Sequence, residues 1–378
     1  MTGSDDAAKA ELLALVEKAN SQMGGAYKNK VIGGRPGERP RFEFYHAAPS
    51  LCSHKVRTVL AEKGVPYTSH DMSIMPIGKF IPENYRPEYV RMRLKGAPQA
   101  AYAESYTGES SVTNMGFDPC VVPTLVDLEA GRVVVDSRVI CEYLDANAPQ
   151  GKKLIPAERR EEIEAQEALV DQAPHVAALY GAHPENDHRP AGLRNNITGV
   201  HARKIRVLES VLAFLGDDPE LAPAYRAKIA KEKAAGEFMV DAEGMRETHR
   251  KMARHVDDLA HQLAQHDAPW VCGEAYSMAD ILWTCSLWRM QWLGFGYLWR
   301  GVSGRERLEG YLDRAFQRPS FRSAVVDWAG AHGPSDHVEE HATGAAKRKF
   351  ALHILRTNSW PAVWFGDRKI KLPPLASA

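Results

Sequence analysis

The sequence predicts a small α/β domain followed by an all-helical domain, with peripheral segments at both ends. The chain has 378 residues, which is more than one hydrophobic core usually serves. Strand and helix patterns alternate up to about residue 148, whereas beyond Pro156 apolar residues recur at helical spacing only. We therefore expect an N-terminal arm at 1–39, an α/β domain at 40–150, a helical domain at 151–330 and a C-terminal tail at 331–378.

The composition excludes several classes of protein. Apolar residues make up 44% of the chain and charged residues 25%, as in ordinary globular proteins. The 48 basic residues balance the 48 acidic ones, so no basic field favours nucleic acid. The N-terminus has neither the apolar core of a signal peptide nor an Arg-rich transit pattern. The most apolar stretch, 279–299, is interrupted by Asp280, Arg289 and Gln291, which indicates a buried helix rather than a membrane span. We expect a cytoplasmic protein with no nucleic-acid or membrane partner.

The cysteines and histidines predict neither disulfides nor a metal site. The five cysteines are odd in number, widely spaced and without a CxxC pair: Cys52, Cys120, Cys141, Cys272 and Cys285. The spacing of five between His261 and His266 is poor for one helix face. We expect free thiols in a reducing compartment and no bound metal.

The α/β domain is predicted from alternating local patterns. The arm contains an amphipathic helix at 10–20, followed by a stretch rich in Gly, Pro and Lys that is typical of a solvated linker. Residues 41–47 predict a strand, 50–64 a helix ended by Gly64, and 65–74 a second strand. An irregular excursion at 75–119 follows, with helical turns at 87–94. Loops of that length are usually functional. Two strands joined by a turn at 129–131 then lead into a helix that begins at Asp136 and Ser137.

The second half carries helical periodicity throughout. The predicted helices lie at 157–178, 201–215, 223–233, 245–266, 278–292 and 306–316. The tail is polar and rich in histidine before an apolar, aromatic segment, and we expect it to wrap around the molecule or to swap.

Cys52 is the candidate nucleophile. It opens the helix at 50–64, with Ser50 or Ser53 available as N-cap. The positive end of a helix favours the thiolate, whereas burial in an apolar core opposes it. The alternative is a small core residue at a tight packing point. No second cysteine follows three residues on, so a disulfide formed at Cys52 needs an external thiol to resolve it, and glutathione is the obvious candidate.

Two further features suit a peptide-like ligand. Val122 and Pro123 precede a strand expected beside the Cys52 helix. A cis bond there would turn the preceding backbone groups outward toward a ligand, although an ordinary trans edge proline is more common. Asp136 and Ser137 begin the next helix, where backbone N–H groups and the Ser137 hydroxyl suit a carboxylate, although each alone is an N-cap.

In this order, the helix-start thiol, the Val-Pro pair and the Asp-Ser pair resemble the glutathione transferase superfamily. The segment WVCGEAYSMADILW, with Gly273 and the capping box from Ser277 to Asp280, is similar to the superfamily's helical-domain signature. The resemblance spans about residues 41–330. It implies a thioredoxin-like domain followed by the helical domain of these enzymes. It also implies a glutathione site made of Ser53, Val122, Pro123, Asp136 and Ser137.

Within that superfamily, FEFYHAAPSLCSHKVRTVLAEKGV resembles the glutathione-dependent hydroquinone reductive dehalogenases, in particular the larger dichlorohydroquinone branch. YTGESSVTNMGFDPCVVPTLVD and PHVAALYGAHPENDHRP extend the likeness. The resemblance implies reductive dehalogenation of a halogenated aromatic diol with glutathione as co-substrate. In that reaction Cys52 acts as the resolving thiolate, and Ser50 is placed to bond the glutathione thiolate unless it only caps the helix. The resemblance also implies a homodimer, the usual oligomeric state of the family.

The resemblance also indicates residues for the substrate hydroxyls in the helical half: His175, Tyr180, His201 and Lys204. The alternatives are a satisfied core polar residue for His175 or Tyr180 and a solvated face for Lys204. Two other functions remain open. One is a different cysteine-type transferase reaction, such as conjugation, ether cleavage or maleyl isomerisation, and the other is a non-catalytic binding module with the same fold.

Overall fold

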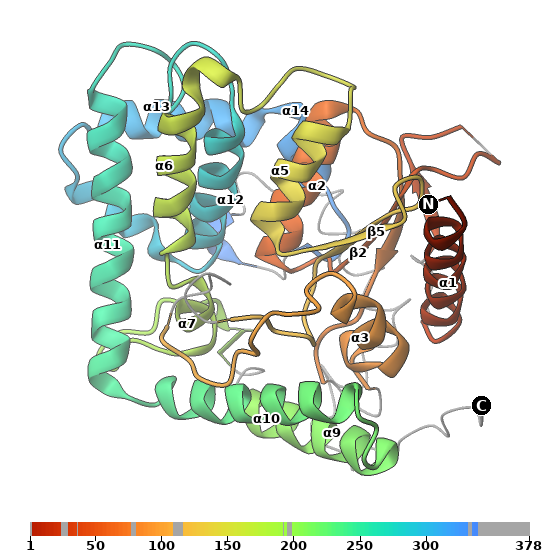
Figure 1. Ribbon diagram of the computed structural model, residues 1–378. Helices are drawn as coiled ribbons and strands as arrows, with labels where there is room; N and C mark the ends of the chain where they lie inside the picture. The colour runs from red at the N-terminus through yellow and green to blue at the C-terminus, as the bar shows by residue number, and fades with distance from the viewer. Residues whose placement is uncertain are drawn as a thin grey trace.

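The computed structural model describes residues 2–23, 29–35, 37–76, 81–108, 116–191, 193–194, 199–331 and 335–338. It confirms the predicted fold class, a thioredoxin-like domain followed by a helical domain (Figure 1). Among the described residues, no helix is long and apolar enough to cross a membrane.

A five-stranded mixed sheet forms the centre of the N-terminal domain. Its strand order is β1-β3-β2-β4-β5. The strands are β1 (Lys30–Ile32), β2 (Phe42–His46), β3 (Tyr67–Asp71), β4 (Thr124–Asp127) and β5 (Arg132–Val135). Helix α2 (Leu51–Lys63) connects the parallel pair β2 and β3, and the other neighbouring strands are antiparallel.

Alternate residues of each strand face two different cores. Phe42 and Phe44 of β2 pack with α2 and with α5 (Ser137–Asn147), on the face toward the helical domain. Tyr45 packs on the opposite face with α1 (Thr2–Ser21) and α3 (Pro87–Leu94). This period of two is the reason that one short apolar strand serves both cores.

The arm is more ordered than its composition indicates. Helix α1 is longer than the predicted helix at 10–20, and its buried side chains Leu12, Leu15 and Val16 lie against the sheet. The segment predicted to be a solvated linker contributes strand β1, in which Val31 pairs with Thr68. That part of the prediction was wrong, because pairing to β3 stabilises a strand where the local composition favours none.

The excursion contributes the 3-10 turn η1 (Glu83–Tyr85) and helix α3 where helical turns were predicted. Arg93 of α3 is buried and donates to the carbonyl oxygens of Asp118 (3.0 Å) and Pro123 (2.6 Å). Helix α3 therefore holds both the end of the excursion and the start of β4. Residues 77–80 and 109–115 of the predicted excursion lie outside the described residues.

The helical half follows the predicted runs, with one break. The elements are η2 (Ala157–Arg159), α6 (Arg160–Asp171), α7 (His175–Tyr180), α9 (Val200–Leu215), α10 (Leu221–Phe238), α11 (Ala242–Ala264), α12 (Met278–Trp292), η3 (Phe295–Gly301), α13 (Arg305–Gln317), α14 (Pro319–Phe321), the π-helix η4 (Arg322–Val326) and η5 (Asp336–Val338). The run predicted as one helix at 157–178 divides into α6 and α7, because Pro174 lacks an N–H donor and the chain turns there.

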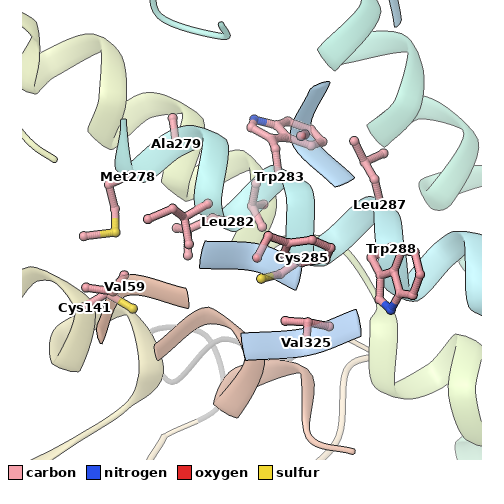
Figure 2. Packing of buried hydrophobic residues seen from close by; sticks show 14 of the residues in the cluster. Val59, Cys141, Met278, Ala279, Leu282, Trp283, Cys285, Leu287, Trp288 and Val325 are labelled. Carbon is pink, nitrogen blue, oxygen red and sulfur yellow. The ribbon is translucent and has the colours of Figure 1, made fainter. Parts of the chain in front are cut away.

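Helix α12 joins the two domains. It begins with the predicted capping box between Ser277 and Asp280 and is buried along its length. Figure 2 shows Cys285 and Leu282 of α12 facing Val59 of α2 and Val325 of η4 within one continuous core. The domains therefore share a hydrophobic core, and α2 lies at their boundary. The tail beyond η5 lies outside the described residues.

Candidate active site

Cys52 is the second residue of α2 and carries a free, half-buried thiol. The Ser50 hydroxyl is the N-cap and accepts a hydrogen bond from the Ser53 N–H at 3.3 Å. The sequence left Ser50 between capping and catalysis, and the structure shows the capping bond. The thiol lies in the first turn, where unpaired N–H groups present partial positive charge.

The loop before α2 is fixed by hydrogen bonds from α2 itself. Ser53 is buried, and its hydroxyl accepts from the Ala47 N–H at 3.2 Å. Arg57 donates to the carbonyl oxygens of Ala47 (3.2 Å) and Ala48 (3.0 Å). Ser53, predicted as a glutathione ligand, thus has its hydroxyl directed to the loop. These bonds hold the approach to Cys52 in one conformation.

The peptide bond between Val122 and Pro123 is cis. It precedes β4, which pairs antiparallel with β2 through Thr124 and Tyr45. The Tyr89 hydroxyl donates to the Val121 carbonyl at 2.7 Å, so the segment is anchored from α3. Within the described part of the chain, neither the N–H nor the carbonyl of Val122 has a hydrogen-bond partner. Both groups therefore keep their hydrogen-bonding capacity.

Asp136 and Ser137 begin α5, as predicted from their spacing. The Asp136 side chain caps the helix by accepting from the Arg138 N–H at 2.9 Å. Its φ of 74° and ψ of 131° are a sparsely populated backbone conformation for a residue with a side chain. Helices α5 and α2 lie side by side in Figure 1, so the starts of two helices belong to the same side of the domain.

Two cations interact with Cys52: Lys55, which follows it closely in the sequence, and Arg289, to which the sequence assigned no role in the site. Lys55, one turn along α2, is ion-paired with Asp171 at 3.4 Å. Burial alone would lower the pKa of Lys55, but attraction to Asp171 and then to Cys52 outweighs it, and that pKa is raised. Arg289 of α12 donates to the Pro49 carbonyl, just before the N-cap. Burial lowers the pKa of Arg289 to about 10, against the attraction of Tyr180 and Cys52.

Three of the four predicted substrate residues, Tyr180, His201 and Lys204, lie together. With Glu232 they form what we call the substrate-side cluster. The rings of Tyr180 and His201 are 5.3 Å apart, and the Lys204 ammonium lies 4.5 Å from the centre of the Tyr180 ring. Glu232 of α10 accepts from His201 at 2.8 Å and pairs with Lys204 at 3.2 Å. Because Tyr180 also acts on Arg289, this cluster connects electrostatically to the Cys52 side of the site.

A network of buried ion pairs is connected to the substrate-side cluster through Glu232. Lys228 pairs with Glu232 at 2.8 Å and with Asp118 at 2.7 Å, and Lys231 pairs with Asp118 at 3.0 Å. Burial would raise the pKa of Glu232, but attraction to Lys204 and Lys228 holds it well below the usual range. Burial would also raise the pKa of Asp118, but Lys228 and Lys231 lower it. The network thereby fixes the excursion to α10.

His175 lies apart from these residues, in what we call the buried histidine cluster: His175, His255 and Ser286. The Ser286 hydroxyl is 2.8 Å from His175 Nε2 and 3.1 Å from His255 Nε2. His255 also stacks on Trp283. Burial, and then repulsion by His255, lowers the pKa of His175 well below its ordinary value. His175 is thus a core residue bonded to Ser286, which is the alternative that the sequence left open.

Comparison with known proteins adds to this geometry. The family model for the glutathione S-transferase N-terminal domain matches residues 49–147. The 2,5-dichlorohydroquinone reductive dechlorinase of Sphingobium indicum is 43% identical over 79% of this chain and 86% of its own length. The chain belongs to the glutathione transferase superfamily. This membership confirms the resemblance predicted from the sequence. Because its named relatives are enzymes, this glutathione transferase is also an enzyme.

Other relatives are more distant. The tetrachloro-p-hydroquinone reductive dehalogenase of Sphingobium chlorophenolicum is 30% identical over 77% of this glutathione transferase and 99% of its own length. Among solved structures, the β-etherase of Sphingobium sp. strain SYK-6 is 22% identical, with a TM-score of 0.48 and coverage of 75% of this chain and 98% of that one.

In the described ranges, no group of three or more side chains is arranged to hold a metal ion.

The site residues that sequence reasoning missed had weak signals. Arg289 interrupts the most apolar stretch of the sequence, and a charge in a buried helix is a functional signal. Lys55 follows Cys52 at the spacing of one helical turn. For Glu232 the local signal was Lys228 four residues earlier, whereas its partners His201 and Lys204 lie on α9, about 30 positions away.

Proposed function

We propose that this glutathione transferase reductively dehalogenates a chlorinated hydroquinone with glutathione as co-substrate. The observation that carries the proposal is the half-buried Cys52 thiol at the start of α2, flanked by Lys55 and Arg289. The 43% identity to a 2,5-dichlorohydroquinone reductive dechlorinase supports the substrate class. The proposal places the enzyme in the cytoplasm, where glutathione keeps thiols reduced.

The chain offers groups that fit glutathione. The backbone of Val122, beside cis Pro123, suits the peptide part of the molecule. The start of α5, with Asp136 and the Ser137 hydroxyl, suits a carboxylate. Ser53 contributes through its position in the first turn of α2 rather than through its hydroxyl. A tripeptide bound along these groups would bring its sulfur toward Cys52.

In the first step, the glutathione thiolate attacks the halogen-bearing carbon of the keto tautomer of the hydroquinone. A carbon–sulfur bond forms, and the halide leaves with the electron pair of the carbon–halogen bond. Loss of a proton from carbon restores the aromatic ring as a glutathionyl hydroquinone. In this proposal Tyr180, His201 and Lys204, which lie together in the substrate-side cluster, hold the oxygen atoms of the ring. His175 is left out of this role because its ring is bonded to Ser286 in the core.

In the second step, the Cys52 thiolate attacks the thioether sulfur of the conjugate. A sulfur–sulfur bond forms and the carbon–sulfur bond breaks, so its electron pair stays on the ring carbon, which takes up a proton. A second glutathione reduces the resulting mixed disulfide and leaves as oxidised glutathione. The two glutathiones supply both electrons that replace the halogen by hydrogen.

The variant Cys52→Ser tests the proposal. We expect halide release in the first turnover and accumulation of the glutathionyl hydroquinone, with formation of the dehalogenated product reduced about 100-fold or more. Mass spectrometry of the reaction mixture detects the conjugate, and mass spectrometry of the wild-type protein after glutathione withdrawal detects glutathione on Cys52. Cys272→Ser, which changes a buried thiol of the helical domain, is the matched control and should behave as wild type.

The outcomes separate the alternatives. Turnover of the chlorinated hydroquinone by Cys52→Ser at the wild-type rate, with no conjugate, contradicts the proposal and favours another cysteine-type transferase reaction. Failure of the wild-type protein to bind glutathione resin, release halide or oxidise glutathione favours a binding module with this fold.

A further inference from the structure

Helix α12 brings Arg289 to the start of α2. The Cys285 sulfur lies 3.9 Å from the Thr58 hydroxyl, in the second half of α2. One helical turn further along α12, Arg289 donates to the Pro49 carbonyl, before α2 begins. The two helices therefore run in opposite directions where they touch, and this direction places the Arg289 guanidinium over the first turn of α2, which contains Cys52.

The charge of Arg289 has no carboxylate partner within the described ranges. The residue is 6% exposed, its guanidinium lies 5.3 Å from the centre of the Trp292 ring, and it donates a hydrogen bond to the neutral Pro49 carbonyl. Lys55, the other cation beside Cys52, pairs with Asp171. Buried cations are normally paired, since an isolated charge in the interior is costly. A buried guanidinium beside a thiol and without a carboxylate is a site prepared for an anion.

Tyr180, Cys52 and the more deeply buried Cys285 are the groups whose electrostatic interaction with Arg289 opposes the effect of burial on its pKa. Of the two thiols, Cys285 is fully buried and near Thr58, whereas Cys52 is half-buried. Burial raises the pKa of Cys285 to about 12, so that thiol stays protonated at neutral pH. Cys52 is thus the more accessible of the two thiols that interact with Arg289.

We propose that Arg289 is the counter-ion of the Cys52 thiolate. This inference rests on the proposed function, in which that thiolate attacks the conjugate. The guanidinium stabilises the thiolate before attack. During attack the negative charge leaves sulfur for the hydroquinone ring, and the guanidinium, which interacts with both Cys52 and Tyr180, stabilises that charge as it moves. Arg289 acts through the state of Cys52 and is in this sense a positioning residue.

The rate of Cys52 alkylation by iodoacetamide as a function of pH, followed by peptide mass spectrometry, tests the inference. Arg289→Met keeps an apolar stem and removes a buried charge, a change that folded proteins often tolerate. We expect alkylation at pH 7 to slow about tenfold and to recover as the pH is raised. Arg289→Lys restores the charge and should recover most of the rate. Arg289→Gln replaces the methionine variant if that one does not fold.

Arg57 provides a matched control. It is also a buried arginine that bonds carbonyls of the loop before α2, but its charge acts on Asp71, Tyr67 and Cys285 rather than on Cys52. If Arg289 only fixes this loop, Arg57→Lys and Arg57→Gln slow alkylation as much as Arg289→Met, and the inference is overturned. An alkylation curve for Arg289→Met that superimposes on the wild-type curve also overturns it. The assay needs no turnover, so failure of the dehalogenation proposal would be seen separately, in Cys52→Ser.

Discussion

The substrate-side cluster and the buried histidine cluster solve the burial of polar side chains in opposite ways. In the first, His201 and Lys204 share the carboxylate of Glu232, which in turn belongs to a network of ion pairs. In the second, His175 and His255 share only the hydroxyl of Ser286, and burial keeps both rings neutral. The substrate-side cluster therefore consists of ion pairs, whereas the buried histidine cluster consists of neutral groups.

This difference teaches that the partner of a histidine, rather than its presence in a helix, decides its role. A ring beside a carboxylate lies where charge is stabilised, which suits substrate oxygens. A ring beside a hydroxyl in the core serves packing. The sequence placed His175 and His201 in one group because both lie in helical runs of the second half, and only their partners separate them.

The largest expected effect is the removal of the carboxylate that holds the substrate-side cluster together. In Glu232→Gln, Lys204 loses its carboxylate and Lys228 keeps only Asp118, so buried positive charge is left uncompensated. Breaking a buried ion pair from one side costs about 3–5 kcal/mol. We expect the free energy of unfolding, measured with denaturant, to fall by about that amount.

Glu247→Gln is the control for that variant, since Glu247 forms its ion pairs with Arg250 and Arg254 on the exposed face of α11. Its effect should be far smaller, because exposed ion pairs contribute little. An equally small effect of Glu232→Gln would mean that the network is not needed for the fold, and the comparison between the two clusters would lose its basis.

The buried histidine cluster predicts a dependence of stability on acid. Burial lowers the pKa of His255 to about 3, from an ordinary value of 6.5. Between these pH values the unfolded chain binds a proton that the folded chain does not, so stability is lost as the pH falls below about 6.5. Each such histidine adds a slope of about 1.4 kcal/mol per pH unit.

The variant His255→Gln isolates this contribution, because glutamine keeps a hydrogen-bonding group and does not titrate. Unfolding by denaturant at pH 7, 6 and 5 should show a shallower loss of stability in the variant than in the wild type, by about 0.7 kcal/mol from pH 7 to 6 and about 1.2 kcal/mol from pH 6 to 5. Parallel curves would contradict the assignment of a neutral, sealed histidine.

Much of the fold could be predicted because its signals are local. The start of α2 is encoded by Ser50 three residues before the N–H that it caps, and its end by Gly64 in the left-handed conformation with a φ of 65°. The capping box of Ser277 and Asp280 is equally local. These signals place Cys52 at a helix start from sequence alone.

What could not be predicted depends on contacts between distant residues. Strand β1 exists because Val31 pairs with Thr68, in a segment whose own composition favours a loop. Arg289 reaches Pro49 across 240 positions, and Lys228 reaches Asp118 across 110. These contacts place Arg289 and the network behind Glu232, so sequence patterns indicated the thiol and the nearby Lys55 but not the role of Arg289.

The smallest expected effect is on catalysis rather than on stability, and it distinguishes the functions of the two clusters. Tyr180→Phe keeps the ring over which the Lys204 ammonium lies and removes only the hydroxyl, whose contact in the described residues is a weak one to the sulfur of Met75 at 3.9 Å. If that hydroxyl holds a substrate oxygen, kcat/KM for a chlorinated hydroquinone should fall about threefold to tenfold, the equivalent of one hydrogen bond. The denaturant midpoint should stay unchanged, and Tyr297→Phe, on the half-exposed turn η3, should change neither quantity.

Ser286→Ala should show the reverse. It leaves the Nε2 atoms of His175 and His255 without their shared hydroxyl, so stability should fall while kcat/KM of the folded enzyme is kept. A loss of kcat/KM in Ser286→Ala, with none in Tyr180→Phe, would exchange the roles of the two clusters and move the substrate to the His175 side of α7.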